Sequence, residues 1–106
     1  MPIAKTPQPP FYAVIFTSSR SDGDHGYAAM AQRMAHLAEQ QPGFLGIESA
    51  REEIGITVSY WESLEAIAAW KENLQHRMAQ EQGQALWYTH YCLRVCKVER
   101  QSDFPA

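Results

Sequence analysis

The sequence predicts an α+β fold in which four strands and two helices follow the order β-α-β-β-α-β. Aromatic and β-branched residues concentrate in four stretches, which is typical of strands. Two longer stretches carry apolar residues at every third or fourth position, which is typical of helices. Two of the strand stretches are separated by only a short turn and are expected to form a hairpin. This order is typical of a ferredoxin-like arrangement, a four-stranded antiparallel sheet with both helices on one face.

The first half of the chain is expected to supply one strand and one helix. Phe11–Ser18 predicts the strand, and a polar loop follows in which Asp22 or Asp24 is expected to cap the next helix. Tyr27–Gln41 predicts that helix, which the proline–glycine pair at 42–43 ends. The apolar stripe of the helix consists of Tyr27, Met30, Ala31, Met34, Leu37 and Ala38.

The second half is expected to open with a hairpin of Phe44–Glu52 and Ile56–Glu62. Ser63 stands where a helix N-cap belongs, and a glutamate follows in the first turn, where the helix dipole favours a negative charge. Leu86–Arg100 predicts a long final strand.

The second helix carries a stripe that would place His76 on its opposite side if the helix were continuous. We therefore expect a break near Asn73–Gln75 and a short extra helix that runs to Gln82, with Gly83 ending it. The apolar stripe consists of Leu64, Ile67, Leu74 and Met78.

The chain of 106 residues suits a single domain, expected at 11–100. Prolines in residues 1–10 favour extended chain, and we expect a flexible lead-in there; packing of this segment over a partner subunit is the alternative. Residues 101–106 are expected to form a C-terminal tail.

Charge and composition exclude several classes of function. The net charge of −3 leaves no basic excess for nucleic-acid binding. No apolar run is long enough to span a membrane, and residues 1–10 do not resemble a secretory signal. Two cysteines are too few for a disulfide scaffold, so a reduced cytoplasmic setting is expected.

Both sides of the predicted sheet are apolar. In the first strand, Phe11, Ala13 and Ile15 alternate with equally apolar neighbours, and the last strand does the same. Two helices cover only one side, and a monomer rarely leaves so large an apolar patch exposed. The sequence therefore predicts a homodimer in which two sheets pack face to face.

Four stretches carry a resemblance to the antibiotic biosynthesis monooxygenase family. They are PGFLGIES (42–49), ITVSYWESLEAIAAWKENLQH (56–76), AQEQG (79–83) and WYTHYCLRVCKVER (87–100). The resemblance implies a dimeric α/β barrel. It also implies an activity among those of the family, which includes cofactor-independent oxygenases of polycyclic phenols and haem-degrading enzymes.

An oxygenase without flavin or metal takes its electrons from the substrate, so it needs an apolar pocket, a base and donors for the substrate anion. The expected substrate is a small phenolic or quinol-type molecule, and no cofactor or metal is expected. His76 is the candidate base because histidine titrates near neutrality. Trp70 and Asn73 lie within successive helical turns of it, so the three are predicted to line one wall. Trp70 also matches a pocket tryptophan of the family. Candidate substrate contacts are Tyr60, Trp61, Tyr88, His90 and Arg94.

Each candidate also has a structural interpretation. Trp70 suits a core or interface position, Asn73 suits a helix break, and His76 suits a surface position. Tyr88, His90 and Arg94 are spaced for one side of the last strand, where Arg94 is alternatively expected to pair with a carboxylate such as Glu48. A non-catalytic dimeric binding or stress-response module is the alternative function.

Three further interpretations of the sequence are disfavoured. Haem degradation is disfavoured because the resemblance implies a ligating histidine ten residues after Trp70, where the chain has Gln80, and an asparagine in the first strand, which has none. The acidic loop with His25 suits a helix cap better than a metal site. Cys92 and Cys96 lie four residues apart, about 13 Å along a strand, which is too far for a disulfide.

Overall fold

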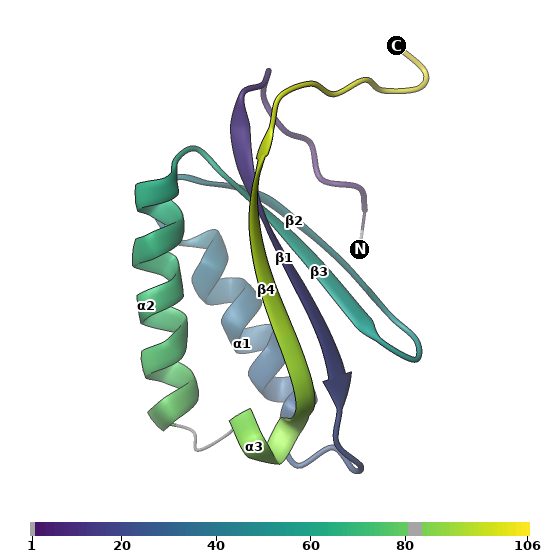
Figure 1. Ribbon diagram of the computed structural model, residues 1–106, viewed down its shortest axis with the longest axis vertical. Coiled ribbons are helices and arrows are strands. Elements are labelled where there is room, and N and C mark those ends of the chain that lie inside the picture. The colour runs from purple at the N-terminus through teal and green to yellow at the C-terminus, as the bar shows by residue number, and fades with distance from the viewer. Residues whose placement is uncertain (1, 81–83) are drawn as a thin grey trace.

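The computed structural model describes residues 2–80 and 84–106, and it confirms the predicted β-α-β-β-α-β order (Figure 1). The strands form one antiparallel sheet in the order β2-β3-β1-β4, and α1 and α2 lie on the same face of it. The elements are β1 (Phe11–Arg20), α1 (Tyr27–Glu39), β2 (Phe44–Arg51), β3 (Gly55–Trp61), α2 (Leu64–Gln80), α3 (Gln84–Trp87) and β4 (Tyr88–Val98).

Helix α2 runs without interruption through residues 73–75, so the predicted break there is wrong. The segment contains neither glycine nor proline, the residues that most often interrupt a helix. Its polar side chains near His76 face solvent and need no change of direction. A separate short helix does exist, but it is α3. The predicted end at Gln82 and Gly83 lies outside the described residues.

Side-chain oxygens accept hydrogen bonds from backbone amides at the starts of both long helices. The Ser63 hydroxyl accepts a hydrogen bond from the Ala66 amide at 3.0 Å, as predicted for α2. Before α1, the Asp24 carboxylate accepts the amides of Gly26 at 3.0 Å and Ala28 at 3.2 Å. Of the two aspartates predicted to cap α1, Asp24 is therefore the one that accepts hydrogen bonds from amides at its start.

The core lies between the helices and one face of the sheet, which we call the helix face. Trp61 on β3 is fully buried there, and its ring stacks on Trp70 of α2 with centroids 5.9 Å apart and an interplanar angle of 22°. The indole N–H of Trp61 donates to the hydroxyl of Ser59 at 2.9 Å, so its one polar group is satisfied. The buried cluster consists of Val14, Ala38, Trp61, Ile67 and Trp70.

A register shift in the β1–β4 ladder changes which β4 side chains reach the helix face. Ser19 pairs with His90 but Arg20 pairs with Tyr88, so one β4 residue is left without a β1 partner. Tyr88 therefore lies on the helix face, with its ring 5.5 Å from that of Phe16. The prediction that Tyr88, His90 and Arg94 share one side of the strand is wrong, because alternation from an unshifted register does not hold across a bulge.

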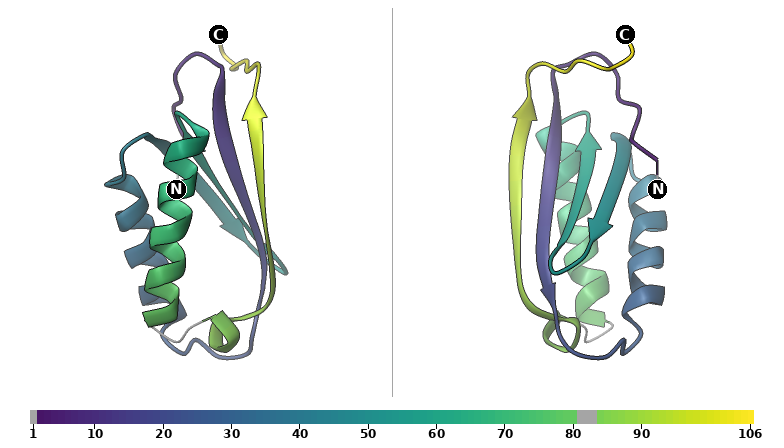
Figure 2. Two further views of the ribbon diagram at one scale, coloured as in Figure 1. Left: turned by 60° about the vertical axis from the view of Figure 1, so that its left-hand side comes forward. Right: turned by 90° about the vertical axis from the view of Figure 1, so that its right-hand side faces the viewer.

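We call the opposite side of the sheet the outer face, and the lead-in runs beside β2 at one edge of it (Figure 2, right). The Ala4 amide donates to the Glu48 carboxylate at 2.9 Å, and a Cβ at Gly46 would lie 3.0 Å from the Cβ of Ala4. The Thr6 hydroxyl bonds the Gln101 side chain at 2.7 Å, so the two terminal segments meet at one end of the sheet. Within residues 2–80 and 84–106, none of the helices combines the length and apolar character required to cross a bilayer.

Candidate functional site

A cavity of about 330 Å³ separates the helix face from α1 and α2. This volume lies at the lower end of the range for small-molecule sites. Every strand and both long helices contribute to its lining. The apolar part of the lining includes Val14 and Phe16 of β1, Met30 and Met34 of α1, Ile47 of β2, Trp70 and Leu74 of α2, and Leu93 of β4.

Small residues on α1 help to create the space. Ala31, Ala35 and Ala38 stand along the cavity side of this helix, and their methyl groups do not reach across to the sheet. The Trp61–Trp70 stack holds the Trp70 indole in place, and Trp70 is 8% exposed. The apolar region therefore combines a fixed aromatic wall with room for a flat ligand.

The sheet supplies hydroxyl groups to the lining of the cavity. Ser49 and Thr57 lie opposite each other on β2 and β3, and their hydroxyl oxygens are 2.9 Å apart. Ser59 also lines the cavity, but its oxygen accepts the Trp61 N–H. These groups are uncharged and can orient a polar ligand.

Two phenols line the cavity where α1 and β4 begin. The rings of Tyr27 and Tyr88 meet edge to face with centroids 5.7 Å apart. Burial, and then the negative potential and hydrogen bond of the neighbouring Tyr27 phenol, raise the pKa of Tyr88 well above its usual value. Tyr88 is therefore protonated at neutral pH and can donate a hydrogen bond.

Two guanidinium groups lie beside this phenol pair. The Cζ atom of Arg20 is 3.6 Å from the Tyr27 ring centroid, and that of Arg51 is 5.7 Å from it. Arg20 is held by the carbonyl oxygens of Trp87 at 2.9 Å and Gly23 at 3.1 Å. This end of the cavity is consequently both polar and electropositive.

The structure separates the predicted site residues into two groups. Trp70 and Tyr88 line the cavity. Asn73 is half-buried and His76 is exposed, and neither is part of the lining. In a continuous helix six residues turn the chain by about 600°, so His76 points about 120° away from Trp70. The predicted wall of Trp70, Asn73 and His76 is therefore not formed as a unit.

Of the other predicted contacts, Trp61 is buried in the core on the helix face, and the remaining three lie on the outer face. His90 and Arg94 pair there with Ser19 and Ile15 and are exposed. Arg94 is separated from Glu48 by two intervening strands, about 14 Å, so the predicted pair between them is wrong.

Tyr60 occupies the outer face with Glu48. Its hydroxyl donates to the Glu48 carboxylate at 2.5 Å. Burial, and then the hydrogen bond and negative charge of Glu48, raise the pKa of Tyr60 to about 12. This pair also receives the Ala4 amide, so it anchors the lead-in to the sheet.

Tyr27 lines the cavity but was not among the predicted site residues. It begins the apolar stripe that the sequence predicts for this helix. The available signal was its type, because it is the one aromatic residue in a stripe otherwise made of alanine, leucine and methionine.

Metal-ligating groups do not gather in the described part of the chain. No cluster of three histidine, cysteine, aspartate or glutamate side chains suited to a metal ion occurs there. Cys92 is half-buried and Cys96 exposed, and both are free thiols.

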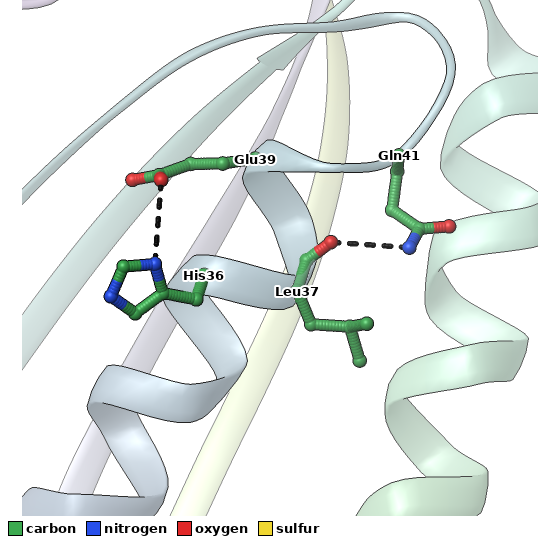
Figure 3. Close-up of polar contacts among 4 residues, drawn as sticks. All are labelled: His36, Leu37, Glu39 and Gln41. Carbon is green, nitrogen blue, oxygen red and sulfur yellow. Dashed lines mark hydrogen bonds and ion pairs between the residues drawn. The ribbon is translucent and has the colours of Figure 1, made fainter.

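A smaller groove of about 210 Å³ lies between α1 and α2. Figure 3 shows the end of α1 beside it, where His36 Nδ1 lies 3.8 Å from the Glu39 carboxylate and the Gln41 amide donates to the Leu37 carbonyl at 3.1 Å. The groove is lined by Arg33, Met34, His36, Leu37, Gln40 and Arg77.

Comparisons with known proteins agree with this architecture. The family model described as antibiotic biosynthesis monooxygenase matches residues 10–82. The uncharacterised protein YqjZ of Bacillus subtilis (strain 168) is 53% identical over 104 residues, covering 96% of this chain and 91% of its own.

Two solved structures share the fold. SnoaB, a cofactor-independent oxygenase from Streptomyces nogalater, superposes with a TM-score of 0.65 at 13% identity, covering 92% of this chain and 100% of its own. A mutant of MhuD with two manganese protoporphyrin IX molecules bound per active site superposes with a TM-score of 0.61 at 28% identity, covering 87% and 98%.

Proposed function

The chain belongs to the antibiotic biosynthesis monooxygenase family, and on that premise we propose that it is a small oxygenase acting on a phenolic or quinol-type molecule without a cofactor. The observation that carries the proposal is the cavity, an apolar space against the Trp70 ring with hydroxyl groups at its edges. The oxygenase SnoaB has the same fold, which supports this choice of chemistry.

Oxidation of a phenol or quinol by molecular oxygen requires few groups from the protein beyond an apolar cavity. A phenol that loses a proton becomes an electron-rich anion, and this anion, whose charge is shared with ring carbon, passes electrons to molecular oxygen. For a ring CH₂ group, one oxygen atom forms the new carbonyl and the other leaves as water with the two hydrogens. The substrate supplies the electrons, so the protein has to exclude bulk water and orient the ring.

Trp70 is the side chain that we propose to contact the substrate ring. It is held by the Trp61 stack, and Leu74 extends the same wall one turn along α2. Asn73 lies between them in sequence and is half-buried, so it is a candidate for positioning this wall. A role for the exposed His76 as base requires proton transfer through solvent.

Oxygen uptake with a panel of anthrones and quinols tests the proposal. We expect uptake above that of heat-treated protein and a loss of tenfold or more in kcat/KM for Trp70→Leu, which removes the aromatic wall. Phe104→Leu is the matched control, because this aromatic side chain is 98% exposed in the C-terminal tail. No uptake across the panel, in protein that is folded and binds the compounds, contradicts the oxygenase proposal.

A non-catalytic binding module is the second candidate, and one observation favours it. Among the described lining residues there is neither a histidine nor a carboxylate, so no ordinary general base faces the cavity. Ligand-dependent increases in melting temperature without oxygen uptake would select this function.

Haem chemistry fits the residues present less well. The MhuD structure binds a metalloporphyrin, but no histidine or cysteine occurs in the described lining of this cavity. The phenol of Tyr88 has a raised pKa, the opposite of what a tyrosinate ligand requires. A hemin titration decides the point: a stoichiometric Soret shift that is lost in His76→Ala would favour haem binding.

We also propose that two copies associate through the outer face. Ile15 and Val58 are half-buried there and Ile56 is 42% exposed, although the lead-in runs beside β2 at one edge. Sedimentation at micromolar concentration is expected to give a dimer, and a well-folded monomer would contradict this assembly.

A further inference from the structure

We propose that the Tyr27–Tyr88 phenol pair, backed by the charges of Arg20 and Arg51, binds a single ionised oxygen of an aromatic ligand, a phenolate or enolate. This inference deepens the proposed function and rests on it for the aromatic ligand in the cavity. It assigns the orientation of that ligand, with its anionic oxygen toward the start of α1 and its rings toward Trp70.

The placement of the two phenols is the first step. Both rings line the cavity, and they come from elements far apart in the sequence, the first turn of α1 and the first residue of β4. The β1–β4 register shift brings Tyr88 to the helix face, and its ring also packs against Phe16 and Tyr91 at 5.5 and 5.6 Å. The Tyr88 ring is therefore held between three aromatic rings, as the positioned group of a recognition site requires.

Each phenol of the pair carries one O–H donor. Both side chains line the cavity and their rings are in contact, so the two donors come from one end of it. A tyrosine O–H is protonated at neutral pH, and burial raises the pKa of Tyr88 further. An O–H that donates to an anionic oxygen forms a stronger hydrogen bond than one that donates to a neutral oxygen.

The positive charges of Arg20 and Arg51 are not neutralised by the groups to which these side chains donate hydrogen bonds. Arg20 donates to carbonyl oxygens, and Arg51 donates to the hydroxyl and carbonyl oxygens of Ser18. These partners are neutral, and in the described part of the lining there is no carboxylate. Both guanidinium groups lie beside the Tyr27 ring, and their positive charges act to lower the pKa of Tyr88 against the larger effect of burial.

The geometry favours one oxygen over a carboxylate. An arginine recognises a carboxylate by presenting two parallel N–H groups. Here both forks are directed at backbone and serine oxygens, so the arginines act as nearby charges. Gly55 leaves room for the Arg51 guanidinium group, because a Cβ there would overlap it. A hydroxyl donor in a positive field suits a phenolate, which carries its charge on one oxygen.

Binding of 4-nitrophenol and of its methyl ether, 4-nitroanisole, tests the inference. Both fill the same apolar space, but only the phenol ionises. We expect wild-type protein to lower the apparent pKa of bound 4-nitrophenol by about one unit, a tenfold preference for the anion. Absorbance of the nitrophenolate measures this shift, and quenching of tryptophan fluorescence measures affinity for both probes.

Variants separate the phenols from the charges. Tyr88→Phe and Tyr27→Phe keep the rings and are each expected to remove most of the tenfold preference, since a bond to a charged acceptor is worth about that factor. Arg51→Met is expected to reduce it about threefold. Tyr91→Phe is the control, because this phenol touches Tyr88 but is absent from the cavity lining. Melting curves establish that each variant is folded.

The outcomes distinguish this inference from the proposed function. Equal affinity for phenolate and ether in wild type, or a preference that survives in both phenylalanine variants, overturns the anion site and leaves the cavity as a binding site. If neither probe binds, the anion site and the aromatic-binding cavity are both wrong. A preference lost in Tyr88→Phe and kept in Tyr91→Phe supports the inference.

Discussion

Replacement of Gly43 by alanine is predicted to destabilise the fold for two separate reasons. It lies in the turn between α1 and β2 with φ of 85°, a conformation that costs an L-residue about 1–2 kcal/mol. A Cβ at this position would also lie 2.6 Å from the Cβ of Ala66 on α2, closer than two methyl carbons can approach. The clash adds about 1–3 kcal/mol, the usual cost of overpacking a fixed site. Gly43→Ala is therefore expected to lower the free energy of unfolding by about 2–5 kcal/mol.

Gly26→Ala isolates the backbone contribution. Gly26 has φ of 82°, but a Cβ there would meet no atom within 4 Å. It is the N-cap of α1, where alanine is also unfavourable, so its cost is an upper bound for backbone strain. The remaining steric part is tested by repeating Gly43→Ala in an Ala66→Gly background, where the expected cost falls to about 1–2 kcal/mol.

Urea unfolding followed by circular dichroism measures these free energies, with unchanged m-values as the check on two-state behaviour. The reasoning is refuted if Gly43→Ala costs no more than Gly26→Ala, or if the Ala66 background makes no difference. The result bears on the site, because the Gly43 carbonyl accepts the Glu62 amide at 2.8 Å just before α2, the helix that carries Trp70.

Three further outcomes follow from individual side chains. Trp70→Ala is expected to lower the free energy of unfolding by about 3–5 kcal/mol in urea titrations, and Trp70→Phe by clearly less, because the indole is buried against Trp61; equal costs would show that the stack contributes little. The pKa of Tyr60 is raised from 10.0 to about 12 in the folded protein, so its stabilising effect is complete below pH 10 and is lost as the pH rises to about 12. Unfolding free energy should fall more steeply over this interval in wild type than in Tyr60→Phe, and matching slopes would argue against the shift. His76→Ala should change the affinity for 4-nitroanisole by less than about twofold, because His76 is exposed and absent from the cavity lining. A tenfold loss of affinity in fluorescence quenching, equal to about 1.4 kcal/mol, would instead place His76 at the site.

Local sequence patterns predicted most of the fold. Alternating apolar residues located the strands, and the Ser63 cap located the start of α2. The wrong predictions concern the face of a strand or helix on which a side chain lies, because each was made from one element alone. One unpaired residue in the β1–β4 ladder places Tyr88 on the helix face. The sequence around this register shift contains no residue type that predicts it. The position of His76 suggested a break in α2, although an exposed histidine is simply what a continuous helix places there.

The candidate site was less predictable because it is assembled from distant segments. Trp70 could be proposed from a resemblance, and in the structure it lines the cavity and stacks on Trp61. The pairing of Tyr27 with Tyr88 depends on a contact between residues 61 positions apart, which neither helical nor strand periodicity can express. Arg51 reaches Tyr27 from a third segment, the end of β2.

The bond between Thr6 and Gln101 implies that the chain could be reconnected in a different order. The two residues are joined side chain to side chain, so a short linker would bridge them without crossing the sheet. A new opening at the exposed residues 52–54, between β2 and β3, would leave every strand pairing intact. Such a circular permutant would begin with β3 and end with β2, and both halves of the cavity would still come together from one chain.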